Sequence, residues 1–455
     1  MKNLFKTLII ITVLSLVCFT LAGCVSKGEK EETASGETVP VQKETSAGEK
    51  TAKSEKNKTT GGVNGTAITL SGSSASVSGS GAVYENGNVV ITSGGSYTLS
   101  GEINGGQIVV DAGDEDVTLI FDSVKITSSD SSAVNVVKAG SVIIELKDGT
   151  DSELTDASKY SFDGDYSDAE KEEPDACVFS KADLTITGQG SLTVNANYKN
   201  GIKSKDNLTI ENTNITVNSE NNALTGSDGV TLNGATLDLT AKGDGIHSNS
   251  SIEIKSGDIT IKSDDDGIHA DDTVTINSGT LNITAHEGIE GTVIKINDGT
   301  VTINSSDDGI NGAQKVDGKT PSVEINGGNI TVTMGSGDTD AIDSNGDIYI
   351  NGGKITITGQ SGFDYDGKAE FNGGEIYLNG EKVTEITNQF AGGMRGFGGA
   401  DQGGGMRSFA DGNQNGDDSF GNLPRGGRWG GSSDGGTGSE NSGSPSFPGS
   451  SGNEV

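Results

Sequence analysis

The middle of the chain alternates apolar and polar residues in short runs that return at a nearly constant spacing. Each repeat is marked by one apolar residue, here called the anchor: Ile202, Leu224, Ile246, Ile268, Ile289, Ile310, Ile342 and Phe363. The spacings between anchors are 22, 22, 22, 21, 21, 32 and 21 residues, and the long one reflects an insertion at residues 313–322. Self-similarity at such a period predicts a repeat architecture.

Two pairs of apolar residues follow each anchor. After Ile268 they are Val274 with Ile276 and Leu281 with Ile283, and the members of each pair lie two positions apart, which is the period of a strand. Three short strands in 21 to 22 residues, without helical spacing or hairpin turns, predict an all-β fold, a right-handed parallel β-helix over residues 63–390. We call one turn of this helix a coil.

Asparagines recur about nine residues after the anchors: Asn233, Asn277, Asn297, Asn326, Asn351 and Asn372. Stacked amides would hydrogen-bond from coil to coil and so support the same fold. Asparagine followed by glycine is also a common turn former, which explains most of this pattern without a ladder.

Polar residues fill two positions beside the anchors, and together they are called the ridge. Two residues before the anchors stand Asn200, Asn222, Asp244, Asp266, Glu287, Asp308 and Asp340. One residue after them stand Lys203, Thr225, His247, His269, Glu290, Asn311, Asp343 and Asp364. Because neighbouring coils lie about 4.8 Å apart, these positions form two adjacent columns on one face.

The ridge predicts calcium as a cofactor. Carboxylate oxygens bind calcium at about 2.3 to 2.6 Å, so an ion between two coils matches the coil spacing. The expected ligands are Asp244, Asp265, Asp266, Glu287, Glu290, Asp307, Asp308, Asp340 and Asp343. The alternative is a solvated acidic stripe that blocks edge pairing and keeps the protein soluble. The stacked histidines His247 and His269 also suit a transition metal, but no third histidine and no useful cysteine is nearby.

Composition and the two ends of the chain set the cellular context. The net charge of −34 excludes nucleic acid as a partner held through phosphates, which needs clustered Lys and Arg. Residues 1–23 have a basic start and an apolar run typical of an export signal, and 24–62 and 391–455 have the composition of a disordered tether and tail. The stretch LAGC resembles the bacterial lipoprotein box, which implies a lipid on Cys24 and a cell-surface location.

Two parts of the chain carry a family resemblance. The stretch SKADLTITGQGSLTVNANYKNGIKSKDNLTI (180–210) and the turns GDGIHS and DDGIHA resemble a clostridial family of exported β-helix carbohydrate-binding lipoproteins, similar in fold to polysaccharide lyases. The resemblance implies bound calcium and binding of plant cell-wall polysaccharides, acidic sugars among them. The acidic turn residues of the family match Asp244, Asp266, Glu287 and Asp308. This chain departs from the family pattern at Asn200 and at 221–222.

Three functions are compatible with these observations. A calcium-dependent, pectate-type lyase needs a base beside the metal, and Lys203 is the only base in its column but lies two coils from Asp244, about 10 Å. We therefore expect a non-catalytic, calcium-dependent, surface-anchored binder of polysaccharide, present as a monomer, with lyase second and a passive adhesion protein third. The candidate sugar contacts are Lys203, His247, His269 and Tyr198.

Overall fold

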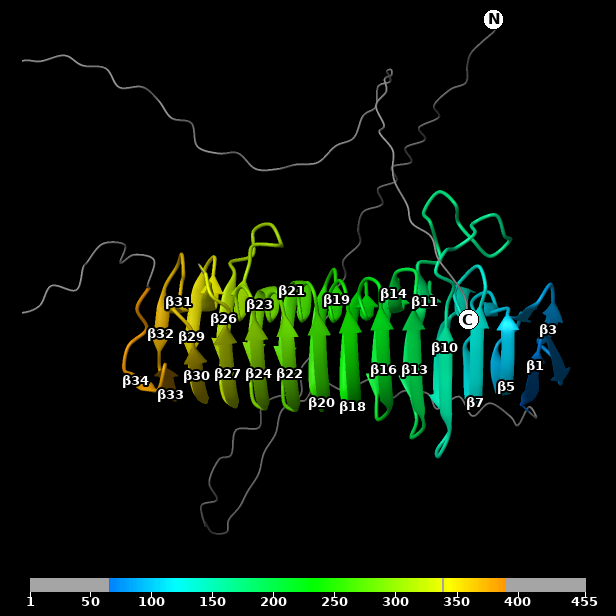
Figure 1. The fold of residues 1–455 in the computed structure, drawn as a ribbon, viewed down its shortest axis with the longest axis horizontal. Coiled ribbons are helices and arrows are strands. Elements are labelled where there is room, and N and C mark those ends of the chain that lie inside the picture. Colours follow the sequence, from blue (N-terminus) through cyan, green and yellow to red (C-terminus); the bar gives the residue numbers. More distant parts are fainter. Residues whose placement is uncertain (1–64, 338, 389–455) are drawn as a thin grey trace, which may run out of the picture.

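The computed structural model describes residues 65–337 and 339–388, and these form a parallel β-helix of about 13 turns. Figure 1 shows the coils stacked side by side from the N-terminal end, in blue, to the C-terminal end, in orange. The strands run from Thr66 to Val383, inside the segment 63–390 in which the sequence predicts the β-helix. The described residues contain no helix, so none there is long and apolar enough to cross a membrane. The prediction of a right-handed parallel β-helix is confirmed.

Each coil contributes one strand to each of three parallel sheets. The first sheet contains the anchors and consists of β4 (Asn88–Ile91), β6 (Ile108–Asp111), β8 (Val134–Lys138), β11 (Ala176–Ser180), β14 (Asn200–Ser204), β17 (Leu224–Gly226), β19 (Ile246–Ser248), β21 (Ile268–Ile276), β23 (Ile289–Ile296), β25 (Ile310–Gly312), β28 (Asp340–Ser344) and β31 (Ser361–Phe363). Its register pairs Ile246 with Ile268 and Ile268 with Ile289, so the anchors stack as the spacing predicts.

The other two sheets share four long strands that bend from one sheet into the next, namely β5 (Gly95–Gly105), β7 (Val117–Ser128), β18 (Gly229–Ala241) and β20 (Ser251–Ser263). The second sheet adds β9 (Ser141–Leu146), β12 (Asp183–Thr187), β15 (Asn207–Glu211), β26 (Ser322–Ile325), β29 (Asp347–Ile350), β32 (Ala369–Phe371) and the ends of β21 and β23. The third sheet adds β10 (Asp151–Thr155), β13 (Ser191–Ala196), β16 (Asn214–Ser219), β22 (Thr280–Ala285), β24 (Thr300–Ser305), β27 (Asn329–Met334), β30 (Lys354–Thr358) and β33 (Glu375–Leu378).

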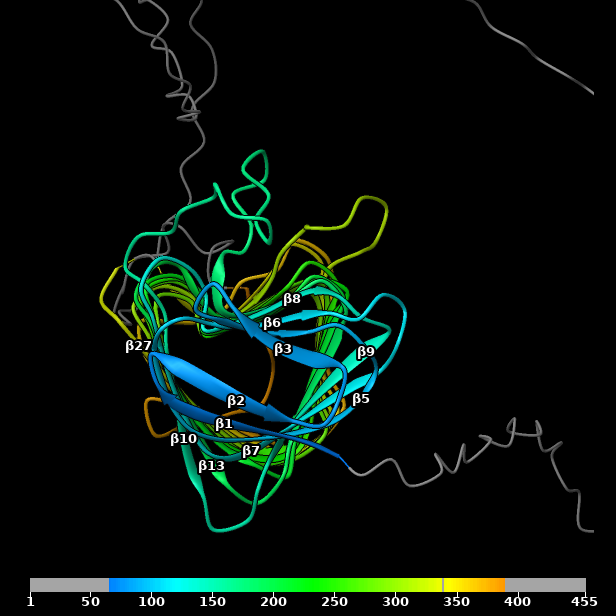
Figure 2. The ribbon, with the colours of Figure 1, turned by 90° about the vertical axis from the view of Figure 1, so that its right-hand side faces the viewer.

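The apolar positions of the repeat point into the interior of the helix. Figure 2 shows the ribbon of the stacked coils in a view along the length of the helix. In one coil the inward residues Ile246, Ile252, Ile254, Ile259 and Ile261 are each at most 1% exposed. Branched aliphatic side chains stack well on their copies in the next coil, because parallel strands buried on their inner face favour such residues. The core is therefore a continuous column rather than the centre of a globule.

Antiparallel pairs between strands close the two ends of the described helix. At the N-terminal end, β1 (Thr66–Gly72) pairs with β2 (Ser74–Ser78), and β3 (Ala82–Glu85) pairs with β4. At the C-terminal end, β33 pairs with β34 (Glu381–Val383). Such hairpins cover edges that would otherwise present unpaired backbone groups to another chain.

The asparagine ladder is present on five of the six expected residues. Amide-to-amide bonds of 2.8 to 2.9 Å connect Asn277, Asn297, Asn326, Asn351 and Asn372 in order. Asn233 lies outside this ladder, because the next coil places Ser256 opposite it, and the Ser256 hydroxyl lies 3.3 Å from Asn233 Oδ1.

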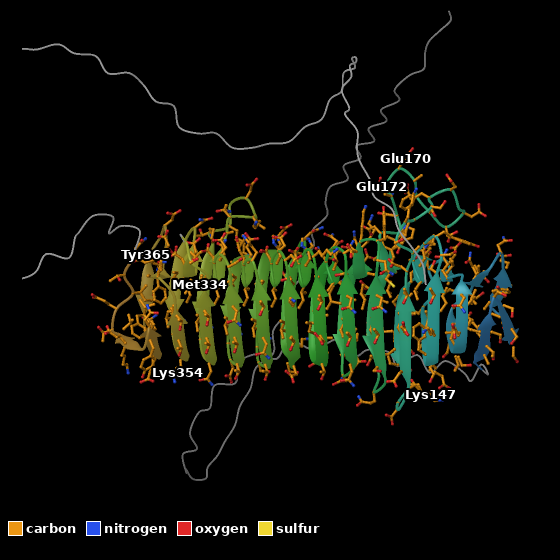
Figure 3. The ribbon with its side chains drawn as sticks, viewed as in Figure 1. Lys147, Glu170, Glu172, Met334, Lys354 and Tyr365 are labelled. Atoms are coloured by element: carbon orange, nitrogen blue, oxygen red, sulfur yellow. The ribbon has the colours of Figure 1, made fainter. Side chains whose placement is uncertain are left out.

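Two insertions rise from the helix beside the first sheet. Residues 156–175 connect β10 to β11, and residues 313–321 connect β25 to β26. Figures 1 and 2 show both projecting from the same side of the helix. Their side chains reach the ridge from outside the repeat. Figure 3 shows the side chains of the repeat as sticks along the whole length of the stack.

Candidate functional site

Four of the residues two positions before the anchors accept a hydrogen bond from the backbone of the next coil. The backbone N–H of one coil donates to the side-chain oxygen of the preceding coil, from Asn222 to Asn200 (3.3 Å), Asp244 to Asn222 (2.9 Å), Asp266 to Asp244 (3.2 Å) and Asp340 to Asp308 (2.8 Å). An amide oxygen accepts this bond as well as a carboxylate oxygen does. Asparagine at 200 and 222 therefore keeps the structural role of the column and removes its negative charge.

Lysines at the N-terminal end of the ridge are paired with acids of the 156–175 insertion. Lys203 Nζ lies 2.7 Å from Asp175 Oδ2, and both side chains are about four-fifths buried, at 22% and 18% exposed. Lys199 Nζ lies 3.2 Å from Glu172, and Lys205 Nζ lies 2.5 Å from Glu173. Sequence reasoning missed these acids, although the run Glu-Glu-Pro-Asp in the insertion is visible in the chain.

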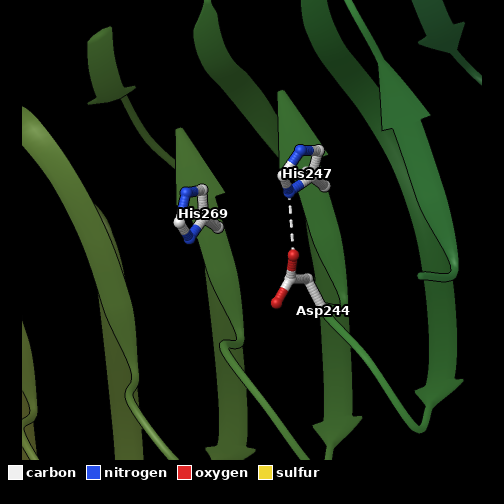
Figure 4. A group of neighbouring side chains, drawn as sticks. All are labelled: Asp244, His247 and His269. Carbon is white, nitrogen blue, oxygen red and sulfur yellow. Dashed lines mark hydrogen bonds and ion pairs between the residues drawn. The ribbon is translucent and has the colours of Figure 1, made fainter. Parts of the chain in front are cut away.

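The two histidines in the middle of the ridge stack as predicted. Their ring centroids lie 5.1 Å apart with an angle of 22° between the planes, and Figure 4 shows His247 directed at Asp244. His247 Nδ1 lies 2.8 Å from Asp244 Oδ2. His269 Nδ1 lies 2.7 Å from Asp266 Oδ2 and 2.8 Å from Glu290 Oε2, so it contacts carboxylates of two coils.

The middle of the ridge carries its own positive charges. Burial alone would lower the pKa of His269, but its bonds to Asp266 and Glu290 outweigh burial and raise that pKa to about 10. Burial alone would raise the pKa of Glu290, but His269 and Lys315 hold it at about 2. Lys315 Nζ lies 2.8 Å from Glu290 Oε1 and comes from the 313–321 insertion. An imidazolium and an ammonium therefore balance the carboxylates of Asp266 and Glu290.

The C-terminal end of the ridge is different, because its acids surround a hollow of about 200 Å³. The lining residues are Asp308, Asp340, Asp343, Ser344, Asn345, Asp364, Tyr365 and Asp366. Burial and neighbouring carboxylates raise the pKa of Asp308 to about 6 and that of Asp343 to about 7. In the described part of the chain, no salt bridge reaches Asp308, Asp343 or Asp364.

The structure divides the predicted metal ligands into several groups, two of which share Asp266, rather than one continuous row. Side-chain oxygens of Asp244, Asp265 and Asp266 lie within 4.8 Å of one another, and those of Glu287 and Asp307 lie within the same distance of each other and of a nitrogen of His286. Burial raises the pKa of Glu287 to about 7, although Asn311 donates a 2.9 Å bond to its carboxylate. Glu290 belongs with His269, and Asp308, Asp340 and Asp343 line the hollow.

Tyr198, a candidate sugar contact, packs into a small aromatic cluster at the base of the 156–175 insertion. Its ring stacks on that of Tyr160 with centroids 4.3 Å apart, and Phe162 lies 6.4 Å away. Lys199 Nζ lies 5.1 Å from the centre of the Tyr198 ring. Tyr160 is buried, and its hydroxyl donates to Asp156 Oδ2 at 2.6 Å. Tyr198 thus holds the insertion against the helix.

An open groove of about 630 Å³ lies on the other side of the turns that precede the first sheet. Asn195, Asn218, Thr240 and Lys262, which occupy equivalent positions on four successive coils, form one of its walls. Among the described residues, its walls carry three acids, Glu153, Glu220 and Asp264, rather than a row of carboxylates like that of the ridge. We therefore place the candidate site on the ridge rather than in the larger groove.

Comparison with known proteins supplies the class of ligand. The family model described as carbohydrate-binding domain-containing protein matches residues 85–341 and 286–391, more than half of the chain. The chain belongs to this carbohydrate-binding family. The matches cover both insertions and the ridge, so the resemblance found in the sequence to a carbohydrate-binding family is confirmed.

Two individual proteins are similar to this chain. A carbohydrate-binding domain-containing protein of Acetivibrio thermocellus is 47% identical over 128 residues, which is 28% of this chain and 43% of that protein. The chain thus spans less than half the length of this relative. A solved structure described as a polysaccharide lyase-like protein from C. thermocellum, gadolinium derivative, is 30% identical and covers 69% of this chain and 96% of its own, with a TM-score of 0.35.

Proposed function

We propose that this protein binds a polysaccharide rich in acidic sugars through calcium on the ridge, without cleaving it. Membership of the carbohydrate-binding family supports a glycan as the ligand. A chain of net charge −34 repels an anionic polymer unless a cation lies between them. Calcium therefore has two roles in this proposal, as a stabiliser of the ridge and as a bridge to sugar carboxylates.

The hollow around Asp308 and Asp343 is the observation that carries the calcium proposal. The carboxylates of Asp308, Asp340, Asp343, Asp364 and Asp366 line it, and carboxylate oxygens are ligands that calcium prefers. Burial and neighbouring carboxylates raise the pKa values of Asp308 and Asp343, and in the described part of the chain no salt bridge reaches either group. The cluster of Asp244, Asp265 and Asp266 is a second candidate, because its oxygens also converge.

The geometry of the lysines favours binding over elimination. A lyase needs the base and the metal at the same sugar carbon. Lys203 is engaged by Asp175 and lies six coils from Asp343, or about 29 Å at the usual strand spacing. The lysine in the first-sheet column is therefore placed for holding the insertion rather than for removing a proton beside calcium.

Export and attachment to the outer face of the membrane are part of the same proposal. They rest on the signal-like residues 1–23 and the lipoprotein-like Cys24, which lie outside the described residues. A lipid on Cys24 and the segment 24–62 would present the β-helix to polysaccharides outside the cell.

A retention experiment on immobilised polygalacturonate tests the function. The full chain should be retained in calcium, released by chelator, and leave the polymer free of unsaturated uronate ends. Asp308→Asn combined with Asp343→Asn should abolish most of the retention. The matched control, Asp238→Asn with Asp258→Asn, removes the same charge from exposed positions of the third sheet and should leave retention intact. Retention that chelator does not change, or steady release of unsaturated products, would contradict the proposal.

A further inference from the structure

A second hollow lies at the opposite end of the ridge and has a different chemical character. It encloses about 300 Å³, and its lining includes Asp175, Asn200, Lys203, Thr225 and His247. Four of these, Asn200, Lys203, Thr225 and His247, occupy the same two columns that supply Asp308, Asp340 and Asp343 to the first hollow, here called the calcium hollow. The ridge therefore starts at a hollow with amide, hydroxyl and lysine groups and ends at a hollow of carboxylates.

Two buried oxygens of residues that line this hollow have no hydrogen-bond partner among the described residues. Thr225 is only 5% exposed, and neither its Oγ1 nor Asp175 Oδ1 is bonded to another group of residues 65–337 or 339–388. A buried polar atom without a partner is unfavourable by about 1 to 3 kcal/mol. A ligand hydroxyl can donate to Asp175 Oδ1, and a ligand oxygen can accept from the Thr225 hydroxyl, so a polyol would satisfy both atoms.

The charges around this hollow are balanced. Lys203 is paired with Asp175 and Lys199 with Glu172, while Asn200 Nδ2 donates to the backbone oxygen of Asp175 at 2.9 Å. A metal ion or a free anion gains little from a neutral site of this kind. A mixture of hydroxyl, amide and carboxylate groups at short range instead suits the paired hydroxyls of a sugar ring.

We infer that this hollow is a hydroxyl-recognising subsite for one sugar unit of the same polysaccharide, so that the glycan lies along the ridge from here to the calcium hollow. The inference rests on the proposed function and adds the direction and length of the bound chain. Thr225 and Asp343 occupy the same column five coils apart, which corresponds to about 24 Å. One coil is close in length to one sugar unit of an extended glycan, so both hollows are filled by a chain of about six units.

The test compares oligogalacturonates of three and eight units against the full chain and two variants. Thr225→Val removes the hydroxyl at the hollow. Thr213→Val is the matched control, because Thr213 is also buried and also has an unbonded hydroxyl, but lies outside this hollow. Both changes remove an unsatisfied buried group, so neither should lower the melting temperature.

In calcium, the octamer should bind wild type and Thr213→Val equally, and Thr225→Val about five- to tenfold more weakly, the loss of one hydrogen bond. The trimer should bind much more weakly than the octamer, because it reaches one hollow only. Equal affinities of Thr225→Val and Thr213→Val, or of trimer and octamer for wild type, would overturn this inference while leaving the proposed function standing. Absence of any octamer binding to wild type would overturn both.

Discussion

The imidazole Nδ1 of His269 lies 2.8 Å from a carboxylate oxygen of Glu290 on the next coil. This contact, together with Lys315, supplies the middle of the ridge with cations from the protein itself. At the C-terminal end no such cation reaches Asp308 or Asp343 in the described chain, and their pKa values are raised. The acids of the ridge therefore fall into two groups, one paired with cations of the protein and one with no such cation among the described residues.

Removal of calcium is expected to lower the melting temperature. An ion that binds only the folded coils stabilises them by mass action, by about 2.7 kcal/mol at a concentration one hundred times its dissociation constant. Differential scanning calorimetry in calcium and in excess chelator measures the effect. The variant Asp308→Asn with Asp343→Asn should lose most of the calcium-dependent shift, and a wild-type melting curve unchanged by chelator would refute calcium binding at these acids.

The calcium-free protein is expected to become less stable as the pH rises from 5 to 8. Asp308 and Asp343 have raised pKa values of about 6 and about 7 in the folded state, so the folded protein holds protons that the unfolded chain has already released. Their contribution to stability is fully present below the unfolded pKa near 4 and is lost as the pH rises through 6 to 7. Melting temperatures in chelator check the slope, which saturating calcium should flatten or reverse.

The change His269→Gln is expected to destabilise the fold by about 3 kcal/mol, because it leaves the buried carboxylates of Asp266 and Glu290 without their shared cation. Denaturant unfolding measures the loss. His286→Gln is the control, since that side chain is half exposed and its nearest acid, Asp307, lies 3.9 Å away. Similar stabilities of the two variants would show that His269 does not balance the ridge.

The change Cys24→Ala is expected to release the protein from the membrane fraction into the medium, since this cysteine is the one lipid attachment point that the sequence indicates. Cell fractionation followed by immunodetection measures the distribution. Ser26→Ala, a small change two residues away, is the control and should leave the protein attached. Equal retention of both variants would contradict lipid anchoring at Cys24.

The sequence by itself determined the features that repeat. Equivalent residues of successive coils lie opposite one another in a parallel sheet, so a period of 21 to 22 residues is enough to predict the core, the stacked histidines and most of the asparagine ladder. The exception is Asn233, which lies outside the ladder because the next coil has Ser256, not asparagine, at the position that pairs with it.

Only the tertiary structure decided which ridge residues are balanced and which are open. Lys203 pairs with Asp175 and Glu290 pairs with Lys315 because two insertions beside the first sheet place one side chain each against the ridge, and the path of an insertion follows no period. The pairing of Lys203 connects it to the 156–175 insertion, and the pairing of Glu290 connects it to the 313–321 insertion. Charge balance depends on these distances between segments far apart in the chain, and the repeat alone contains no information about them.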